Sequence, residues 1–119
     1  MNPEVLNSLR AAARALDAKK AFHLVALDVA ARTSIADAFM ICSVGSSRQA
    51  HAAAEEVERE LKLLGRRPLA IEGLPHASWV LMDYGDFILH IFMEEQRDYY
   101  ALDRLWGDAP AVPDLLERP

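Results

Sequence analysis

The feature that most constrains the fold is the stretch WVLMDYGDFILHIFM at residues 79–93. Two apolar runs, rich in β-branched and aromatic side chains, flank a short polar break that contains Gly85. Glycine can adopt the positive φ that a tight hairpin turn needs, so the pattern predicts a β-hairpin. We expect its strands to span Trp79–Met82 and Phe87–Met93.

Side chains alternate along a strand, so the two faces of this hairpin should differ. If residues 84–85 form the loop, one face carries only apolar side chains and should lie in the core. On the other face Asp83 would oppose Asp86, and Trp79 would oppose His90. Because like charges across a hairpin repel, we interpret this mixed face as a binding surface for a basic partner.

Composition places limits on the kind of protein. A length of 119 residues predicts one domain, and 52% hydrophobic residues is enough for a packed core. A net charge of −5 argues against a general nucleic-acid binder, whose affinity comes mainly from Lys and Arg. The single cysteine, Cys42, allows no disulfide framework or zinc cluster within the chain. With no apolar run long enough to span a membrane, we expect a cytoplasmic protein.

The rest of the chain adds helices and further strands around the hairpin. The pattern predicts an α/β domain over residues 1–107, with a mixed five-stranded sheet flanked by helices, and a flexible tail over residues 108–119. The predicted order is α-β-β-α-β-β-β-α. Helices are expected from Asn2-Pro3, from Ser46 to about Leu64, and from Glu94 or Glu95 to Gly107; the other strands are expected at 22–29, 38–44 and 68–72.

A strand-to-helix junction at Gly45-Ser46 raises an enzymatic alternative. Such a junction can bind a phosphate, and nucleotidyltransferases use a Gly-Ser there together with carboxylates that hold magnesium. Asp83 and Asp86 are the candidate carboxylates, but they flank a turn, and no Asp-x-Asp lies on a predicted strand. Ser46 and Gln49 match a helix-capping box, which we favour as the role of this junction.

Other side chains have a structural and a functional interpretation. His90 lies mid-strand with no second metal ligand nearby, which favours a packed histidine over a catalyst. Cys42 has apolar neighbours, as expected of a buried and inert thiol. Trp79 suits either sheet packing or an interface hot spot. Glu94 and Glu95 suit a helix start as well as binding.

Taken together, these residues resemble the ribosomal silencing factor family, also called Iojap-like. The matching runs cover about three quarters of the chain, in the family's order and spacing. They are LDV at Leu27–Val29, SIADAFMICSVGSSRQ at Ser34–Gln49, EG at Glu72-Gly73, WVLMDYGDFILHIF at Trp79–Phe92, then Arg97, Tyr100 and Leu105-Trp106.

The resemblance implies a function that composition alone does not show. Members have a compact α/β fold related to nucleotidyltransferases but without their catalytic carboxylates. They bind a large-subunit ribosomal protein, number fourteen, on the face that meets the small subunit. Binding blocks subunit joining and lowers translation when nutrients are short. The implied mechanism is steric, with no enzyme activity, cofactor or metal and little direct nucleic-acid reading; members often form homodimers.

The resemblance also assigns roles to individual residues. Those expected to contact the partner combine acidic and aromatic character, which suits a basic ribosomal protein. A second group is expected to support the fold. The partner-binding residues so assigned are Trp79, Asp83, Tyr84, Asp86 and His90, and the structural motif residues are Asp37, Gly45, Ser46, Arg48 and Gly85. Glu94 and Glu95 are added to the partner-binding set because they directly follow the hairpin.

Overall fold

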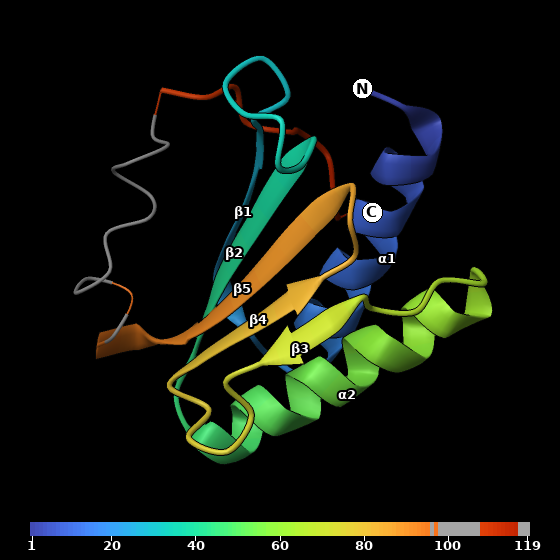
Figure 1. The fold of residues 1–119 in the computed structure, drawn as a ribbon. Coiled ribbons are helices and arrows are strands. Elements are labelled where there is room, and N and C mark those ends of the chain that lie inside the picture. Colours follow the sequence, from blue (N-terminus) through green and yellow to red (C-terminus); the bar gives the residue numbers. More distant parts are fainter. Residues whose placement is uncertain (96, 98–107, 117–119) are drawn as a thin grey trace.

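The structure is a computed structural model that describes residues 1–95, 97 and 108–116. The described elements follow the expected order up to the second hairpin strand, and the predicted last helix lies mostly outside the described residues. The elements are α1 (Pro3–Ala18), β1 (Phe22–Asp28), β2 (Ala38–Val44), α2 (Ser47–Leu63), β3 (Ala70–Glu72), β4 (Trp79–Asp83) and β5 (Phe87–Met93) (Figure 1).

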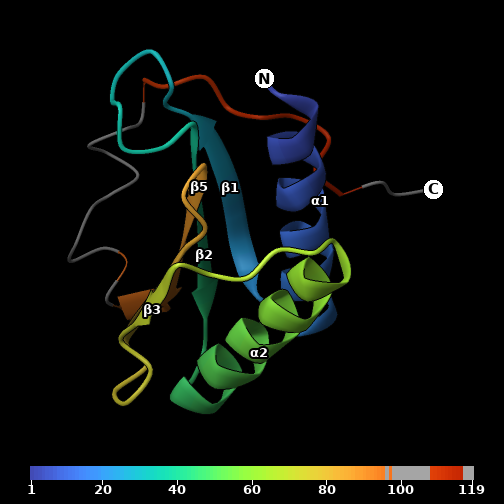
Figure 2. The same ribbon diagram turned by 45° about the vertical axis from the view of Figure 1, so that its right-hand side comes forward.

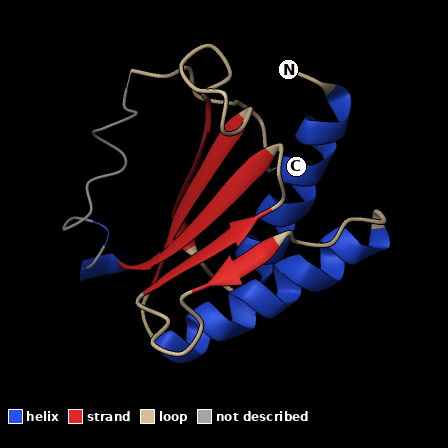
Figure 3. Cartoon of the chain, viewed as in Figure 1, coloured by secondary structure: helices blue, strands red, loops and turns tan. Residues whose placement is uncertain are grey.

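The strands form one five-stranded sheet in the order β1-β2-β5-β4-β3 (Figure 3). Strands β2 and β5 are parallel, whereas the β1–β2, β4–β5 and β3–β4 pairs are antiparallel. The predicted mixed sheet and the antiparallel pairing of the first two strands are therefore confirmed. The hairpin strand β5 lies at the centre of the sheet, where both its edges are paired.

Both described helices pack on one face of the sheet (Figure 2). The apolar hairpin face points toward them, as the alternation of side chains predicted. This face joins the inner stripes of α1 and α2 in one core. From the hairpin it includes the completely buried Val80, Met82, Phe87, Leu89 and Ile91.

Capping residues fix the ends of the helices as predicted. The Asn2 side chain accepts a hydrogen bond from the Glu4 N–H, and Pro3 occupies the first helical position. Helix α2 ends in a Schellman motif: Gly65 has φ +75°, and the Arg66 N–H bonds to the Leu61 carbonyl at 2.9 Å. This stop directs Arg66 back toward the sheet.

A smaller apolar cluster lies on the opposite face of the sheet, which we call the second face. It is centred on Phe39 and Ile88, with Leu27 from β1 and half-buried Leu81 from β4. From the hairpin, the second face carries Trp79, Leu81, Asp83, Ile88, His90 and Phe92.

Residues 108–116, which the sequence analysis assigned to a tail, follow the outer edge of β1. The Asp28 N–H bonds to the Pro110 carbonyl and the Val112 N–H to the Ala26 carbonyl, both at 2.8 Å. Ala109 joins the apolar cluster of the second face, whereas Leu115 joins the helix-side core. The segment therefore passes around the β1 edge and contacts both layers.

Candidate functional site

The hairpin turn differs from the expected one by a single residue. The central residues are Gly85 and Asp86, closed by a 3.0 Å bond from the Tyr84 N–H to the Phe87 carbonyl. Asp83 consequently pairs with Ile88 and not with Asp86, and Trp79 pairs with Phe92 and not with His90. The predicted opposition of two carboxylates is wrong.

Two local interactions explain this choice of turn. The Asp83 carboxylate accepts a hydrogen bond from the Gly85 N–H at 2.8 Å, a common way for Asp to stabilise a turn. The Tyr84 ring stacks on Phe87 with centroids 4.9 Å apart and an interplanar angle of 7°. Gly85, at φ +90°, takes the first central position, where a positive φ is needed.

On the second face, Trp79 is half-buried and held by two ring neighbours from β5. Its ring stacks on Phe92 with centroids 5.1 Å apart. Its indole Nε1–H donates to Nδ1 of His90 at 3.0 Å. Trp79 and His90 are thus diagonal neighbours on one face, which is the closeness expected for them, although not the direct opposition.

His90 is 6% exposed and lies among aromatic rings. Phe39 meets it edge-on at 5.8 Å between centroids. Burial lowers the pKa of His90 from 6.5 to about 4, so the ring is neutral near pH 7. His90 therefore offers a partner little surface, which corrects its expected role as a direct contact and supports the prediction of a packed histidine.

Tyr84 also differs from its expected role. Its side chain is 4% exposed and points into the helix-side core, where burial raises its pKa to about 12. The shifted turn explains this, because residue 84 continues the alternation of β4 beyond Met82. Tyr84 is a core residue and not part of the second face.

Arg66 is the main polar residue that the sequence analysis did not single out. Its guanidinium donates to the Ser8 hydroxyl at 2.9 Å, to the Tyr84 carbonyl at 2.9 Å and to the Asp86 carboxylate at 2.8 Å. Asp86 is thus paired within the chain, and the charge of Arg66 offsets its attraction for a basic partner. The signal that could have found Arg66 is its place directly after the Gly65 helix stop.

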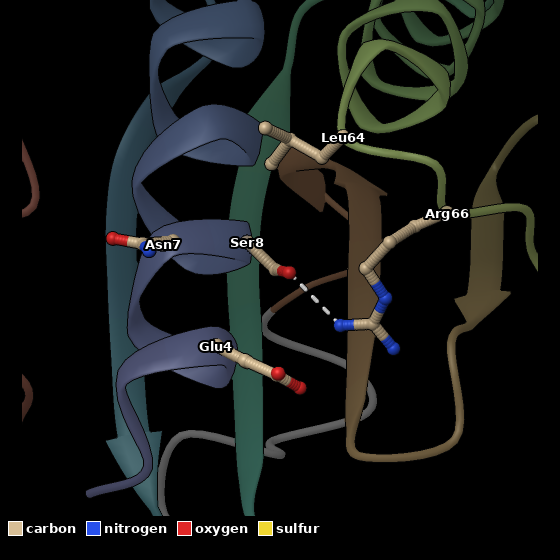
Figure 4. A pocket seen from close by; sticks show the side chains of 5 residues that line it. All are labelled: Glu4, Asn7, Ser8, Leu64 and Arg66. Atoms are coloured by element: carbon tan, nitrogen blue, oxygen red, sulfur yellow. Dashed lines mark hydrogen bonds between the residues drawn. The ribbon is translucent and has the colours of Figure 1, made fainter.

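A cleft of about 360 Å³ lies beside Arg66 (Figure 4). Glu4, Asn7 and Ser8 of α1 line it opposite Leu64 and Arg66, and the Ser8–Arg66 hydrogen bond crosses it. Arg66 already bonds to three groups of this chain, so its role here is to join α1 to the hairpin turn. None of the predicted site residues lines this cleft.

The expected acidic residues do not form one surface. Asp83 and Asp86 lie at the start of β5, whereas Glu94 and Glu95 follow its end. A strand of seven residues separates the two pairs, which corresponds to about 20 Å. Half-buried Glu94 contacts His23 of β1 at 3.1 Å, and Glu95 is exposed.

The Gly45-Ser46 junction is occupied by the chain's own contacts. The Ser46 hydroxyl accepts from the Gln49 N–H at 3.1 Å, which confirms the helix cap. The Gly45 N–H donates to the Gln49 side chain at 2.7 Å, and the Gln49 amide also donates to the carbonyls of Lys19 and Lys20. Gln49 thereby joins the two helices, a role that the capping pattern only partly indicates.

The same geometry separates the groups that the nucleotidyltransferase alternative needs together. Gly45-Ser46 follows the end of β2, and Asp83 and Asp86 flank the start of the parallel strand β5. The two groups therefore lie at opposite ends of the sheet, again about 20 Å apart. Among the described residues, no group of three or more His, Cys, Asp or Glu side chains could hold a metal ion.

The remaining predicted residues occupy supporting positions. The Asp37 N–H donates to the Asp86 carbonyl at 2.8 Å and ties the β1–β2 loop to the hairpin turn. Arg48 is exposed on the first turn of α2. Cys42 is buried, and burial raises the pKa of its thiol to about 12, as expected of an inert cysteine.

Gly73 is a further residue to which the sequence analysis assigned no role beyond the matching run Glu72-Gly73. It has φ +90°, and a Cβ there would come 1.9 Å from the Trp79 carbonyl oxygen. The loop before β4 can pack this closely only because residue 73 has no side chain.

In the described part of the chain, no helix is long and apolar enough to cross a membrane.

Comparison with known proteins identifies the family. Residues 2–119 match the family model described as "Ribosomal silencing factor during starvation". A ribosomal silencing factor from Halalkalibacterium halodurans is 42% identical over 104 residues, which cover 87% of this chain and 89% of that protein. A crystal structure of a Chromobacterium violaceum protein has a TM-score of 0.82 at 31% identity, covering 96% and 94% of the two chains.

A more distant relative carries a name that mentions a ribosomal subunit. The mouse protein "Mitochondrial assembly of ribosomal large subunit protein 1" is 33% identical over 73 residues, which are 59% of this chain and 32% of that protein. The family match spans nearly the whole chain and includes the hairpin, both caps and the tail segment. This chain belongs to the ribosomal silencing factor family.

Proposed function

We propose that this protein silences ribosomes by binding the large subunit in the cytoplasm and preventing it from joining the small subunit. The proposed contact is large-subunit protein number fourteen on the intersubunit face. Binding would lower translation when nutrients are short. The block is steric, so no residue needs a chemical role and no cofactor takes part.

The observation that carries this proposal is the half-buried Trp79 on the second face, opposite the packed helices. Its neighbours Leu81 and Asp83 on β4 are also partly accessible, so aromatic, aliphatic and acidic groups adjoin. Tryptophan in such a setting often supplies much of the binding energy of an interface. A nearby carboxylate steers a basic partner into register.

We propose a smaller set of contact residues than the sequence suggested, because His90 and Tyr84 are buried. Trp79 and Asp83 remain as direct contacts, and Asp86 contributes less because it pairs with Arg66. Glu94 and Glu95 would reach only a partner that extends along the whole length of β5. We include residues 108–116 in the proposed domain because they bond to β1. The homodimer implied by the resemblance stays a prediction.

Co-sedimentation of the purified protein with isolated large subunits, small subunits and joined ribosomes tests the proposal. We expect binding to free large subunits only, weakened by added salt because exposed charges are screened. Trp79→Ala should weaken binding by a factor of about 30 or more, as expected for a loss of ~2 kcal/mol at a hot spot. Leu63→Ala, which truncates a 77% exposed apolar side chain on α2, is the matched control.

A second variant isolates the electrostatic part. Asp83→Asn removes the charge but keeps an oxygen that can accept from the Gly85 N–H, so the turn should survive. We expect weaker binding with a smaller salt dependence. Glu55→Gln, at an exposed position of α2, should change neither the affinity nor its salt dependence. Unaltered salt dependence in Asp83→Asn would remove the electrostatic argument, and a lack of binding to any subunit would remove the proposed function.

A further inference from the structure

We propose that His90 is a positioning residue that fixes the indole of Trp79 in its binding orientation through the Nε1–H to Nδ1 hydrogen bond, without itself contacting the partner. This inference rests on the proposed function for the identity of the partner. The hydrogen bond concerns the protein alone and can be tested without ribosomes.

The geometry leaves His90 few other roles. It is 6% exposed, in the central strand β5, and its ring has aromatic neighbours on β2, β4 and β5. A polar ring buried in such a place costs free energy unless it is hydrogen-bonded. Nδ1 of His90 accepts from the Trp79 indole at 3.0 Å, so this nitrogen is directed at the half-buried residue of the second face.

The chemistry of the donor determines the state of the histidine. An indole N–H can only donate, so Nδ1 must be unprotonated and the ring proton lies on Nε2. Burial favours the neutral ring that this bond requires. Of the rings that the structure describes, those of Phe39, Trp79 and Phe92 meet His90, and none of them carries a titratable charge.

Two contacts together restrict the orientation of Trp79. Stacking on Phe92 fixes the plane of the indole but allows it to slide or rotate within that plane. The hydrogen bond to His90 fixes one edge. An aromatic anchor that is held in place before binding loses less conformational entropy when it binds.

A matched pair of variants separates the hydrogen bond from the packing. His90→Asn keeps an acceptor close to the position of Nδ1, and His90→Leu has nearly the same shape as Asn but no acceptor. The first readout is hydrogen exchange of the Trp79 indole N–H by NMR, with Trp106→Phe used to assign the signal. The second is affinity for isolated large subunits.

We expect His90→Leu to increase indole exchange and to weaken binding by about threefold to tenfold, the range for loss of one hydrogen bond. His90→Asn should retain most of both. In a Trp79→Phe background, which removes the donor, His90→Leu should have no further effect on affinity. That double-mutant comparison also decides the matter if His90→Leu folds poorly by itself.

Opposite results would overturn the inference. Indole exchange in His90→Leu equal to that of the wild type would show that the bond does not hold Trp79. Equal loss of affinity in His90→Asn and His90→Leu, with the indole still protected in the former, would show that His90 acts by another route. If wild-type protein fails to bind large subunits, the proposed function fails, and the exchange measurement still tests the role of His90.

Discussion

The two faces of the β4–β5 hairpin are made by the same two strands, yet they differ in what their side chains can do. The face toward the helices is apolar and completely buried at Val80, Met82 and Leu89. The second face places a histidine beside half-buried Trp79 and a carboxylate, Asp83, four residues farther along β4. The helix-side face of the hairpin is stabilised mainly by apolar packing. The second face carries polar groups, and the free energy that their burial costs must be offset by specific contacts.

Truncation of a large helix-side residue should produce the largest effect. Phe87→Ala removes a completely buried ring that stacks on Tyr84, and should lower the free energy of unfolding by about 3–5 kcal/mol. Trp79→Ala, on the second face, should cost clearly less stability while removing more ribosome binding. Urea unfolding of both variants checks this, and a larger stability loss in Trp79→Ala would contradict the distinction between the faces.

The second face should give the protein a pH dependence of stability between about pH 4 and 7, which comes from His90. His90 has a pKa of about 4 in the folded state against 6.5 ordinarily, so between these values the unfolded chain binds the extra proton. The contribution to stability is complete above about pH 6.5 and should fall by about 3 kcal/mol as the pH decreases to about 4.

His90→Asn provides the reference for this measurement, because carboxylates titrate in both proteins. Urea unfolding at several pH values should show the wild type losing its advantage over His90→Asn as the pH falls from about 7 to 4. A constant difference between the two proteins across that range would show that His90 is not a buried neutral ring.

Loss of Arg66 should have an intermediate effect, because this residue joins the helix layer to the hairpin turn. Arg66→Met keeps much of the aliphatic stem but removes the bonds to Ser8, the Tyr84 carbonyl and Asp86. We expect a destabilisation of about 1–3 kcal/mol, from unpaired polar groups that are partly buried. Arg66→Lys should recover part of it, and thermal unfolding of the three proteins is the measurement.

The smallest effect is expected at the segment that contacts both layers. Val112→Pro removes the N–H that bonds to the Ala26 carbonyl, and should cost about 0.5–1.5 kcal/mol. Val112→Ala keeps the N–H and shortens the side chain, so it distinguishes the effect of losing the side chain from the effect of losing the hydrogen bond. Hydrogen exchange of β1 should increase in the proline variant only, and equal exchange in all three proteins would show that the segment does not protect the β1 edge.

The sequence predicted the features that depend on local periodicity. Alternation along residues 79–93 assigned the hairpin faces correctly, and the caps at Asn2, Ser46 and Gly65 marked helix ends. These signals are local because each depends on the chemistry of a few neighbouring residues.

Features that depend on contacts distant in sequence could not be predicted in the same way. The hairpin register was missed for a different reason: it depends on local contacts such as Tyr84 stacking on Phe87, and a turn one residue earlier fits the same residue pattern. The pairing of Arg66 with Asp86 and the bridge between Leu27 and Ala111 join segments that no local pattern connects. Of the residues predicted for the site, Trp79 lies diagonally beside His90 and not opposite it, Tyr84 is buried in the helix-side core, and the two carboxylates are not opposed.

The one-residue difference in the turn has a consequence for how this hairpin can vary. Moving a turn by one residue changes cross-strand partners in steps of two, and side chains alternate with the same period, so no residue changes face. Substitutions in the turn, or a shift of the turn by one residue, therefore leave each side chain of β4 and β5 on the same face of the sheet. Inserting or deleting one residue within β4 or β5 would instead turn part of the strand inside out and bury Asp83 or expose Met82.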